Sequence, residues 1–568
     1  MAVIPLRGAN QALLHDLAAL TGGHASVGDA DRVAYARDLW PRQQIRTRAG
    51  EAAVSPPAVV VWPGSTDEVS QVVRYAAERG IPLVPYGAGS GVCGGVSPTE
   101  SAIVLDVKRM RALREVDETR LVATAEAGMI GQHLEDGLDE RGFTLGHFPS
   151  SIYCSTLGGW VAGRSAGQCS GRYGKIEDMI VSVLCVDGQG EVRRAGEGGD
   201  PGLLPLIIGS EGILGVVTEA SFHIAPAAKT RRFASFNFGT VAEGLAGIRS
   251  VYQAGLRPAV ARLYDPFDSM LARQGGVKQA RKERTPGPGG QRPARNKRIA
   301  FLRRGAPRRR REKRAYRGYV SDEQRSERGW IGAGRPVYFA PDAQPGLGLE
   351  VLTRALRHPG LLNRLIEGLP GRVTGGVMVI FVWEDDAIIG EAERAVATRI
   401  CTSLGGTDTG EEPGRHWLSH RHSVSYRQSP LYAAGAFVDT MEVAATWSRL
   451  LPMYEAVLQA LSNNVFVMAH FSHAYPDGAS IYFSFAGSAK DDAACLELYD
   501  RTWRSALRTV IDAGGTLSHH HGVGRSKAPA MRREQGVAVD VVRVLSQELD
   551  PHHVLNPGAL IGKAEVHS

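Results

Sequence analysis

The stretch PYGAGSGVCGG, residues 85–95, follows an apolar run and decides how the first part of the chain folds. Its five glycines let the backbone adopt positive φ and approach a ligand closely, so that successive amides converge on a diphosphate. It lacks the Gly-Lys-Ser/Thr ending of a P-loop, and its spacing differs from the GxGxxG fingerprint that opens a helix. Taken alone, the stretch fits either a ligand-binding loop or a glycine-rich turn between strands.

Alternating strands and helices surround this loop. Residues 58–107 alternate apolar runs with the helical segment STDEVSQVVRYAAERG, which opens with Ser65 and Glu68 in capping-box spacing. Strand, helix and strand in so short a segment indicate an α/β or α+β unit. Further along, VSVLCVDGQGEVRRA predicts a hairpin that turns at Asp187 and Gly188.

Two further loops of the same kind follow. PSSIYCSTLGGWVAGRSAGQCSGRYGKIEDMI, residues 149–180, supplies hydroxyls, adjacent glycines and small side chains. GSEGILGVVTEA, residues 209–220, supplies another run of small residues. Three such loops in one domain favour a shared ligand over three unrelated turns.

A second domain begins near residue 230, where SFNFGTVAEGLAGIRSVYQAGLRPAVARLYD predicts strand, helix and strand. It is interrupted at about 275–340 by a segment rich in Pro, Gly and positive charge, which we expect to be disordered or loosely docked. Between Lys278 and Arg317 stand 17 Lys and Arg residues against two Glu, although the whole chain carries only +7. The rest of the protein is therefore net negative.

Composition excludes several classes of protein. No run of about 18 apolar residues is present, so we expect no membrane span. The first residues lack the features of a secretory signal. The six cysteines show no CxxC pairing, which favours reduced thiols over disulfides or a zinc site and points to the cytoplasm.

The three loops, in this order, resemble those of the vanillyl-alcohol-oxidase type of FAD enzyme, which has the PCMH fold. With TLGGWVAGRSAGQ, RYGKIEDMI and SHHHGVG, the chain is most similar to the alkyldihydroxyacetonephosphate synthase (alkylglycerone-phosphate synthase) family, over most of its length outside the basic segment. The resemblance implies an α+β protein. We expect a two-subdomain FAD-binding PCMH-type domain (1–228), an α+β cap with an antiparallel sheet (229–515), and a segment with the histidines and C-terminal helices that returns to the FAD domain (516–568).

The resemblance also implies FAD as the cofactor. The first loop has no histidine, the usual attachment point in related oxidases, so we expect non-covalent binding. The cofactor-binding residues carried over from the family are Pro85, Tyr86, Gly87, Ala88, Gly89, Ser90, Gly91, Ser150, Ser151, Ile152, Tyr153, Cys154, Ser155, Thr156, Gly163, Arg164, Ser165, Ala166, Glu211, Gly212, Ile213, Leu214, Gly215, Val216 and Val217.

The row His519, His520 and His521 matches the family loop that enters the active site, with His520 the first catalytic candidate. Neutral imidazole accepts a proton and, once charged, holds a phosphate or carboxylate. Tyr482, in SIYFSF, matches the family's catalytic tyrosine, although a phenol is a weak base unless cations surround it. The alternative is a surface histidine cluster beside a packed strand tyrosine.

Arg262 and Arg427 match family positions near the active site, and Arg427 is associated with the departing acid. Paired guanidinium donors suit a carboxylate or phosphate. Structural ion pairs are the alternative for both residues.

The resemblance implies a reaction without net redox change. In the family, flavin N5 attacks the carbon that bears the acyl group of acyl-dihydroxyacetone phosphate, fatty acid leaves and fatty alcohol adds, which is a step of ether-lipid synthesis. Tyr482, helped by His520, would remove a proton from that carbon; Arg427 would hold the acid, and the histidine row would meet the phosphate. We therefore expect a small or lipid-derived anionic substrate and a homodimer.

The main alternative is an FAD-linked dehydrogenase of 2-hydroxy acids, such as glycolate or D-lactate. Such enzymes often carry an HxGDGNxH-type metal motif, whereas MAHFSHAYPDGASIYF keeps His470 and His473 but breaks the pattern. We expect no metal; a divalent ion held by His470, His473 and the histidine row is the alternative.

A weaker alternative gives the leading role to the basic segment, as a surface that binds nucleic acid or anionic membrane. Aromatic residues are sparse there, so base stacking has little to act on and we expect no nucleic acid. A cytoplasmic enzyme that touches anionic membranes peripherally fits best.

Overall fold

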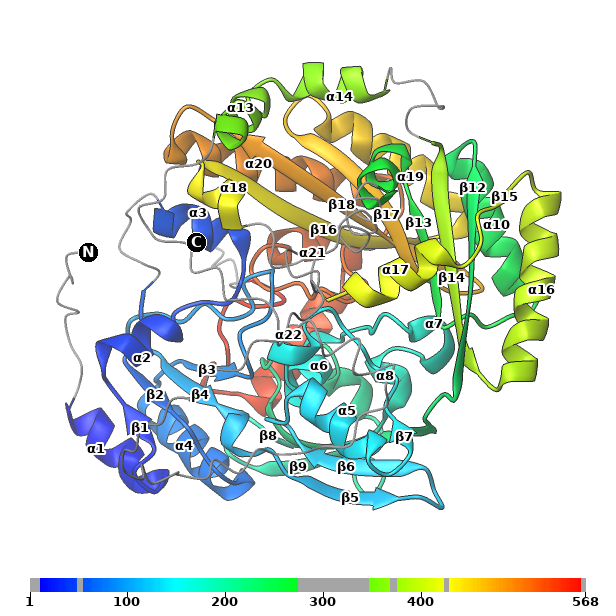
Figure 1. Ribbon diagram of the computed structural model, residues 1–568. Coiled ribbons are helices and arrows are strands. Elements are labelled where there is room, and N and C mark those ends of the chain that lie inside the picture. Colours follow the sequence, from blue (N-terminus) through cyan, green and yellow to red (C-terminus); the bar gives the residue numbers. More distant parts are fainter. Residues whose placement is uncertain (1–10, 49–54, 274–346, 368–374, 423–428, 563–568) are drawn as a thin grey trace, which may run out of the picture. The chain divides into compact units, whose positions relative to one another are not determined.

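The computed structural model describes residues 11–48, 55–273, 347–367, 375–422 and 429–562 (Figure 1). The basic segment at 275–340 and Arg427 lie outside these residues. Among the helices of the described part, none is both long and apolar enough to cross a bilayer.

The first sheet forms around the predicted strand–helix–strand unit, which is confirmed. Its strands are β1 (Ala25–Ser26), β2 (Val59–Val61), β4 (Ile103–Asp106) and β3 (Leu83–Tyr86), with β2, β4 and β3 parallel. Helix α4 (Thr66–Arg79) connects β2 to β3. The Ser65 hydroxyl accepts from the Glu68 amide at 3.2 Å, and Gly80 ends the helix at φ +60°.

The second sheet is antiparallel, in the order β5 (Leu113–Asp117), β6 (Val122–Glu126), β10 (Val216–His223), β8 (Ile180–Val186) and β9 (Val192–Gly196). Strands β8 and β9 form the hairpin expected at Asp187 and Gly188. Strands β7 (Phe143–Thr144) and β11 (Ala225–Pro226) form a separate two-stranded sheet. The helices of this part of the chain are α1 (Gln11–Leu20), α2 (Asp29–Ala34), η1 (Val107–Arg109), α5 (Gly131–Asp139), η2 (Ile152–Cys154), α6 (Leu157–Gly163), α7 (Ser170–Tyr173), α8 (Ile176–Met179) and α9 (Leu204–Ile207).

The third sheet has seven antiparallel strands, as the resemblance implied for the cap. Their order is β15 (Thr407–Asp408), β12 (Thr230–Phe238), β14 (Val377–Asp385), β13 (Val260–Tyr264), β17 (Phe466–Ala474), β18 (Gly478–Ser488) and β16 (Ala436–Thr446). The accompanying helices are α10 (Val241–Gln253), α13 (Leu347–Ala355), α14 (Pro359–Glu367), α16 (Ala387–Ser403), α17 (Glu412–His420), α18 (Ser429–Ala433), α19 (Trp447–Leu461) and α20 (Asp492–Asp512).

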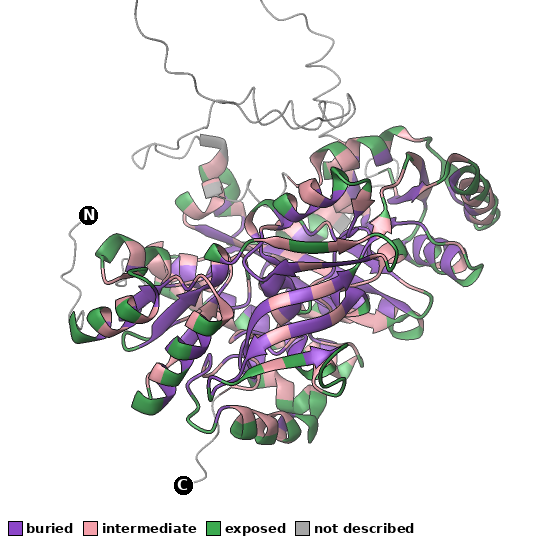
Figure 2. Cartoon of the chain, turned by 90° about the horizontal axis from the view of Figure 1, so that it is seen from below, coloured by how far each residue is buried: buried purple, intermediate pink, exposed green. Residues whose placement is uncertain are grey.

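The first two sheets share one apolar core, and the cap sheet has another; Figure 2 shows buried residues along the strands of the sheets. The expected α+β fold is therefore confirmed. Helix α3 (Pro41–Arg48) comes before the FAD loops in the sequence but packs against the cap. It contacts α20, where Arg42 pairs with Asp500 at 2.8 Å. Ile45 of α3 lies in the core of the cap sheet.

The end of the chain returns to the first sheet. After α21 (Ala528–Gln535) and α22 (Ala538–Leu549), the amide of Leu83 donates to the Val554 carbonyl at 2.7 Å, and the amide of Asn556 donates to the Leu83 carbonyl at 2.8 Å. Residues 516–526, which precede α21, therefore lie between the FAD loops and the cap sheet.

Candidate active site

The structure brings the three predicted FAD loops together. A Cβ on Gly87, in the first loop, would stand 2.4 Å from Thr156 Oγ1 in the second. A Cβ on Gly212, in the third, would stand 3.0 Å from Pro85 Cγ, and Gly212 also has φ +79°. Gly87 of the opening motif and Gly212 of the third loop are therefore required by the close approach of loop to loop.

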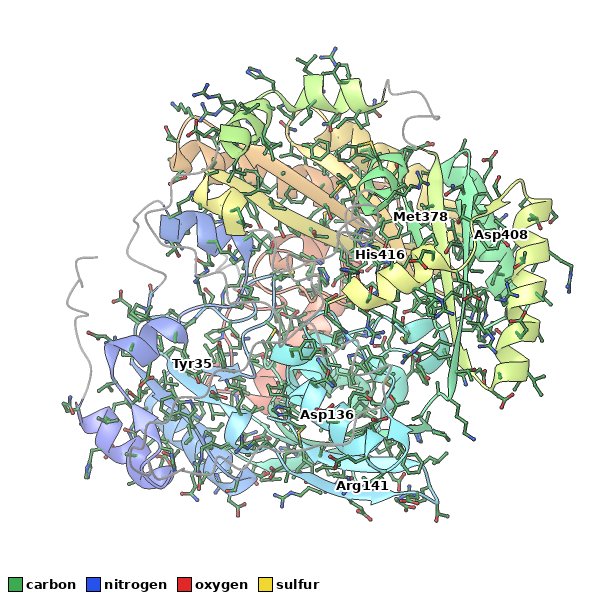
Figure 3. The ribbon with its side chains drawn as sticks, viewed as in Figure 1. Tyr35, Asp136, Arg141, Met378, Asp408 and His416 are labelled. Atoms are coloured by element: carbon green, nitrogen blue, oxygen red, sulfur yellow. The ribbon has the colours of Figure 1, made fainter. Side chains whose placement is uncertain are left out.

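The first loop is fixed by residues that the sequence patterns did not reveal. Lys108 donates to the Gly87 carbonyl and to the Asp106 carboxylate, both at 2.7 Å. Tyr35, labelled in Figure 3, donates to the same carboxylate. Asp38 accepts from the Val96 amide, and burial raises its pKa to about 7.

The second loop is held by hydroxyl groups. The Thr156 hydroxyl caps α6 by accepting from the Gly159 amide at 3.2 Å. Ser165 hydrogen-bonds His147 Nε2 at 2.8 Å, and burial, with the charge of His520 second, lowers the pKa of His147 to about 3. His147 stands alone in the sequence, so no motif pointed to it.

Glu211, in the third loop, joins the FAD loops to the histidine segment. Its carboxylate accepts from the amides of Val523 at 2.5 Å and Gly524 at 2.8 Å, and its carbonyl accepts from Asn556 Nδ2. Burial raises its pKa. The Glu211 side chain, expected to bind cofactor, is thus engaged by the protein's own C-terminal segment.

The loops fit FAD. Ser210 Oγ and His147 Nδ1, both buried beside these loops, have no hydrogen-bond partner among the described residues. Gly163 has open space where a Cβ would stand. Small residues, free backbone surface and unsatisfied polar atoms are what a bound dinucleotide would use.

The candidate catalytic groups form a row across the cap sheet. Tyr482 of β18 lies opposite Glu442 of β16 and opposite His470 of β17. Directly opposed residues share one face of a sheet, so the three side chains meet. The His470 ring stacks on Tyr482 with centroids 4.6 Å apart. Glu442, within FVDTMEVAAT, carried no signal that sequence reasoning could use.

His473 joins this row through a β-bulge. The β17–β18 register shifts between Ser472 and Ala474, and His473 has φ +46°, which is uncommon for a residue other than glycine. In a regular strand, His470 and His473 would point to opposite faces. The bulge places His473 Nε2 2.9 Å from the Tyr482 hydroxyl.

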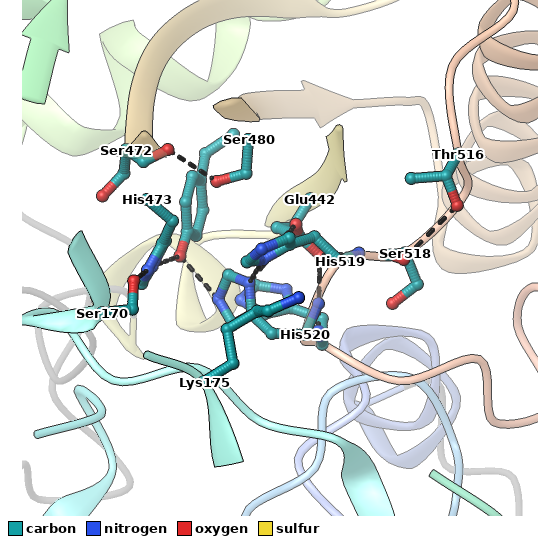
Figure 4. Close-up of polar contacts among 12 residues, drawn as sticks. Ser170, Lys175, Glu442, Ser472, His473, Ser480, Thr516, Ser518, His519 and His520 are labelled. Atoms are coloured by element: carbon teal, nitrogen blue, oxygen red, sulfur yellow. Dashed lines mark hydrogen bonds and ion pairs between the residues drawn. The ribbon is translucent and has the colours of Figure 1, made fainter. Parts of the chain in front are cut away.

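The histidine loop is bound to Glu442. One carboxylate oxygen of Glu442 accepts from the backbone amides of all three histidines at 3.1–3.3 Å (Figure 4). His520 Nδ1 lies 3.3 Å from the other oxygen, Oε1. Burial alone would raise the pKa of Glu442, but His520 and its neighbours outweigh it and hold that pKa well below 4.5.

The outer histidines are neutral near pH 7. Burial, followed by repulsion from His520, lowers the pKa of His519 to about 4 and that of His521 to about 3. Two buried ring nitrogens, Nε2 of His519 and Nδ1 of His521, have no hydrogen-bond partner within the described ranges. A phosphate would therefore find no charge on these two rings.

Tyr482 lies between two imidazoles. Its hydroxyl is 2.7 Å from His520 Nε2 and 2.9 Å from His473 Nε2. Burial and then the charge of Glu442 raise its pKa well above 10, and Arg262 acts in the opposite direction. The expected cationic field does not dominate, so Tyr482 carries its proton and acts as a base only by passing it to a neighbouring imidazole.

Arg262 reaches the site and Arg427 lies outside the described residues. Arg262 Nη1 donates to Ser472 Oγ at 3.4 Å, while its buried Nε has no partner among the described residues. Its guanidinium lies 5.7 Å from the Trp417 ring of α17. Arg421, just after α17, has a buried Nη1 without a partner in the described part, and sequence reasoning missed it.

In the described part of the chain, the histidines named for the metal alternative, His470 and His473, have other partners. His470 Nδ1 lies 3.4 Å from Asp268, and His473 Nδ1 bonds Ser170. In the described part of the chain, the group whose potential ligand atoms lie within 4.8 Å of one another is Glu442, His519 and His520. The Nδ1 atoms of those two histidines are 2.9 Å apart and hydrogen-bond each other.

Comparisons with known proteins agree with this site. A family model for the FAD binding domain matches residues 57–196, and one for the C-terminal domain of FAD linked oxidases matches residues 362–560. An alkyldihydroxyacetonephosphate synthase from Trypanosoma brucei brucei is 24% identical over 541 residues, which cover 92% of this chain and 75% of that protein. The glycolate oxidase subunit GlcD of Bacillus subtilis is 31% identical over 244 residues, 42% of this chain and 49% of that protein.

A solved structure of an alkyldihydroxyacetonephosphate synthase superposes with a TM-score of 0.69 at 22% identity, covering 98% of this chain and 87% of the other. The matched family regions contain the first two FAD loops, Tyr482 and the histidine loop. FAD is therefore the cofactor. The chain belongs to the FAD-dependent enzymes that join a PCMH-type FAD-binding domain to an FAD-linked oxidase C-terminal domain.

Proposed function

We propose that this enzyme exchanges the acyl group of acyl-dihydroxyacetone phosphate for a fatty alcohol, as in ether-lipid synthesis. Two observations support the proposal: the similarity to the trypanosomal synthase over 92% of the chain, and the row of Glu442, His520 and Tyr482. The chemistry of the proposed reaction depends on these three residues.

Glu442, His520 and Tyr482 together can act as a base, and removal of a proton by a base needs no electron acceptor. The Tyr482 hydroxyl lies 2.7 Å from His520 Nε2. His520 Nδ1 hydrogen-bonds His519 Nδ1 and lies 3.3 Å from Oε1 of ionised Glu442. When the phenolic oxygen takes a proton from the substrate carbon, its own proton passes to His520, and Glu442 stabilises the resulting imidazolium. A carboxylate, a histidine and a hydroxyl stand in the same order in hydrolases, where the carboxylate accepts a hydrogen bond from the histidine; here Glu442 acts through its charge at 3.3 Å.

The overall exchange balances without oxidation. The bond between the substrate carbon and the acyl oxygen breaks, a bond to the alcohol oxygen forms, and the alcohol proton leaves with the fatty acid. Bound FAD would supply the isoalloxazine ring beside which the exchange takes place.

The substrate phosphate would bind to arginine. His519 and His521 are neutral, whereas Arg262 is charged and has an unsatisfied buried Nε. We therefore assign Arg262, in place of the whole histidine row, to the phosphate. The role of Arg427 in holding the departing acid stays a proposal.

Oxidation of a 2-hydroxy acid is the second candidate, favoured by the similarity to the glycolate oxidase subunit. In that reaction Tyr482 and His520 would take the hydroxyl proton while two electrons pass to the cofactor. The two candidates therefore differ in whether the flavin is reduced.

Mass spectrometry with ¹⁸O-labelled hexadecanol and palmitoyl-dihydroxyacetone phosphate tests the proposal. We expect labelled ether product and unlabelled palmitate, because the alcohol oxygen enters with its alkyl chain. Tyr482→Phe should abolish product, and Tyr75→Phe, which loses only a hydroxyl bonded to Asp16, should not. Label found only in a fatty ester, or product from Tyr482→Phe at the wild-type rate, would overturn the proposal.

A further inference from the structure

Three possible metal ligands face one another beside the base. They are Oε1 of Glu442 and the Nδ1 atoms of His519 and His520 (Figure 4). The two Nδ1 atoms are 2.9 Å apart, and Oε1 lies 3.3 Å from Nδ1 of His520 and 3.8 Å from Nδ1 of His519. The function proposed above uses Glu442 and His520 for proton transfer and gives His519 no step.

These three distances fit the ligands of a zinc ion. Zinc binds histidine nitrogen at about 2.0–2.1 Å and carboxylate oxygen at about 2.0–2.2 Å. A triangle with these three sides has its centre about 2.0 Å from each corner, so one ion reaches all three atoms. Small rotations of the two rings direct both lone pairs to that point. Two histidines and one glutamate are a set that zinc uses with a fourth position left open.

The Glu442 carboxylate has one oxygen to spare for an ion. Its Oε2 accepts from three amides of the histidine loop, which fixes the side chain and leaves Oε1 facing the two rings. Glu442 is fully buried, and Oε1 has no hydrogen-bond partner in the part of the chain that the structure describes. A buried carboxylate oxygen without a partner is costly, and a cation would remove that cost.

The histidine pair supplies the open side of the cluster and a free lone pair. The His519 and His520 side chains are 10% and 8% exposed, whereas that of Glu442 is not exposed at all. Because the two Nδ1 atoms hydrogen-bond each other, one of them donates and the other accepts with its lone pair. At least one of the two rings is therefore a neutral imidazole, the form that binds metal.

We propose that Glu442, His519 and His520 bind a divalent transition-metal ion of the zinc type, and that the bound ion switches off the base formed by Tyr482 and His520. Binding is argued from the geometry of the three ligand atoms. The inhibition rests on the proposed function, because it requires Tyr482 to pass its proton to His520.

The ion and the base need opposite tautomers of His520. To accept the phenolic proton at Nε2, which lies 2.7 Å from the Tyr482 hydroxyl, His520 must carry its hydrogen on Nδ1. An ion on Nδ1 takes the place of that hydrogen, which moves to Nε2. Nε2 then donates to Tyr482 and cannot accept from it, and no electrons move. The ion also offsets the charge of Glu442 that would stabilise the imidazolium.

The experiment uses flavin-loaded enzyme freed of metal with a chelator. Co²⁺ is added as a probe, because its visible absorption bands when bound to nitrogen lie at longer wavelengths than those of the flavin. In parallel, the ether product from palmitoyl-dihydroxyacetone phosphate and hexadecanol is measured with and without Zn²⁺. The variants are His519→Ala and Glu442→Gln, each with its FAD content confirmed. The control is His416→Ala, which breaks up the stacked pair His416 and His420 on α17, the other place where two histidine rings could share an ion.

We expect wild type and His416→Ala to bind one Co²⁺ per chain, displaced by Zn²⁺. Zn²⁺ should lower product formation roughly 10²-fold, the lower end of what a general base contributes, and a chelator should restore it. His519→Ala and Glu442→Gln should both lose the Co²⁺ bands. The rate of His519→Ala, whatever its value without metal, should not fall further with Zn²⁺.

Co²⁺ bands of equal strength in wild type and in a flavin-loaded His519→Ala or Glu442→Gln would overturn the site. Wild-type product formation that is unchanged when Zn²⁺ fills the site would overturn the inhibition. Metal-free, flavin-loaded wild type that forms no ether product would overturn the proposed function and the inhibition with it, while the Co²⁺ bands would still decide whether the cluster binds an ion.

Discussion

Glu442 anchors the histidine loop and remains charged there. Its side chain is fully buried, yet it stays ionised because three backbone amides and His520 surround it. The neutral state of His519 and His521, by contrast, follows mainly from burial. Glu442 thus lies where it can stabilise positive charge that forms on His520 during the reaction.

Replacing Glu442 with Gln should disable the base. The isosteric amide cannot stabilise the imidazolium of His520, so kcat should fall roughly 10²- to 10⁴-fold with little change in KM. Steady-state assays of the ether product at pH 7 measure this. The matched control is Glu243→Gln, an exposed carboxylate at the start of α10. A wild-type kcat in Glu442→Gln would show that His520 works without its carboxylate.

The candidate catalytic residues show what could be predicted from single positions. Tyr482 and His520 lie in local motifs, and the structure places their polar atoms 2.7 Å apart. Glu442 and His473 enter the site through the pairing of β16 and β17 with β18 and through the bulge at His473. Strand register and bulges depend on partners distant in sequence, so no local pattern contains them.

At the scale of elements, Glu211 of the third FAD loop connects that loop to the histidine loop. Its carboxylate accepts from Val523 and Gly524, and its carbonyl accepts from Asn556. Loss of this joint would release the histidine loop from the FAD loops.

Glu211→Gln should therefore lower kcat more than it weakens FAD binding. A hydrogen bond to a charged group contributes about 1.5–3 kcal/mol, which corresponds to a loss of roughly 10- to 100-fold in kcat. Titration of the apoprotein with FAD and steady-state kinetics give the two quantities. If FAD affinity falls in step with kcat, Glu211 acts on the cofactor itself, as its loop position first suggested.

Helix α5 carries a buried carboxyl group that makes stability depend on pH. Burial raises the pKa of Glu135 from 4.5 to about 8, although the Thr144 hydroxyl donates to it. Because the folded-state pKa is raised, the contribution of the protonated group is fully present below pH 4.5. It is lost as the pH rises through about 8.

Glu135→Gln should remove this loss, because the amide cannot ionise. We expect the variant to melt at a higher temperature than wild type at pH 9, with the difference shrinking toward pH 6. Thermal melts of the flavin-loaded proteins across that range measure it. A difference that does not change with pH would mean that Glu135 is not protonated in the folded protein.

Elements with local signals were predicted correctly. Helix α4 has its Ser65 cap and Gly80 end, and the β8–β9 hairpin has its turn residues. The packing of α3 on α20 was not foreseen, since it depends on ion pairs such as Arg42 with Asp500 between segments far apart in sequence. Capping and turn residues determine where an element begins and ends. The elements that it packs against depend on the whole fold.

At the scale of the whole molecule, the basic segment at 275–340 lies outside the described residues and stays a prediction from the sequence, as do the homodimer and the cytoplasmic location. Its charge would bring the enzyme to anionic membrane, where a lipid-derived substrate is found. The chain elsewhere is net negative, so this contact would depend on the one segment.

Deletion of residues 275–340 should abolish binding to vesicles that contain phosphatidylserine and leave FAD binding intact. Raising the salt to about 1 M, where the Debye length is about 3 Å, should release the full-length protein. Co-sedimentation with anionic and with purely zwitterionic vesicles measures both effects. Equal sedimentation of the deletion variant with anionic vesicles would assign the contact to another surface.

The central claim is that this FAD enzyme exchanges groups on its substrate without reducing its flavin. Its most direct test is the absorbance spectrum of the flavin-loaded protein under anaerobic conditions. The protein is mixed either with palmitoyl-dihydroxyacetone phosphate and hexadecanol, or with D-lactate and glycolate. We predict that the ether product forms and palmitate is released while the flavin remains oxidised after turnover, and that neither hydroxy acid bleaches it. Bleaching by a hydroxy acid, with no ether product from the lipid pair, would contradict the claim and make the enzyme a dehydrogenase.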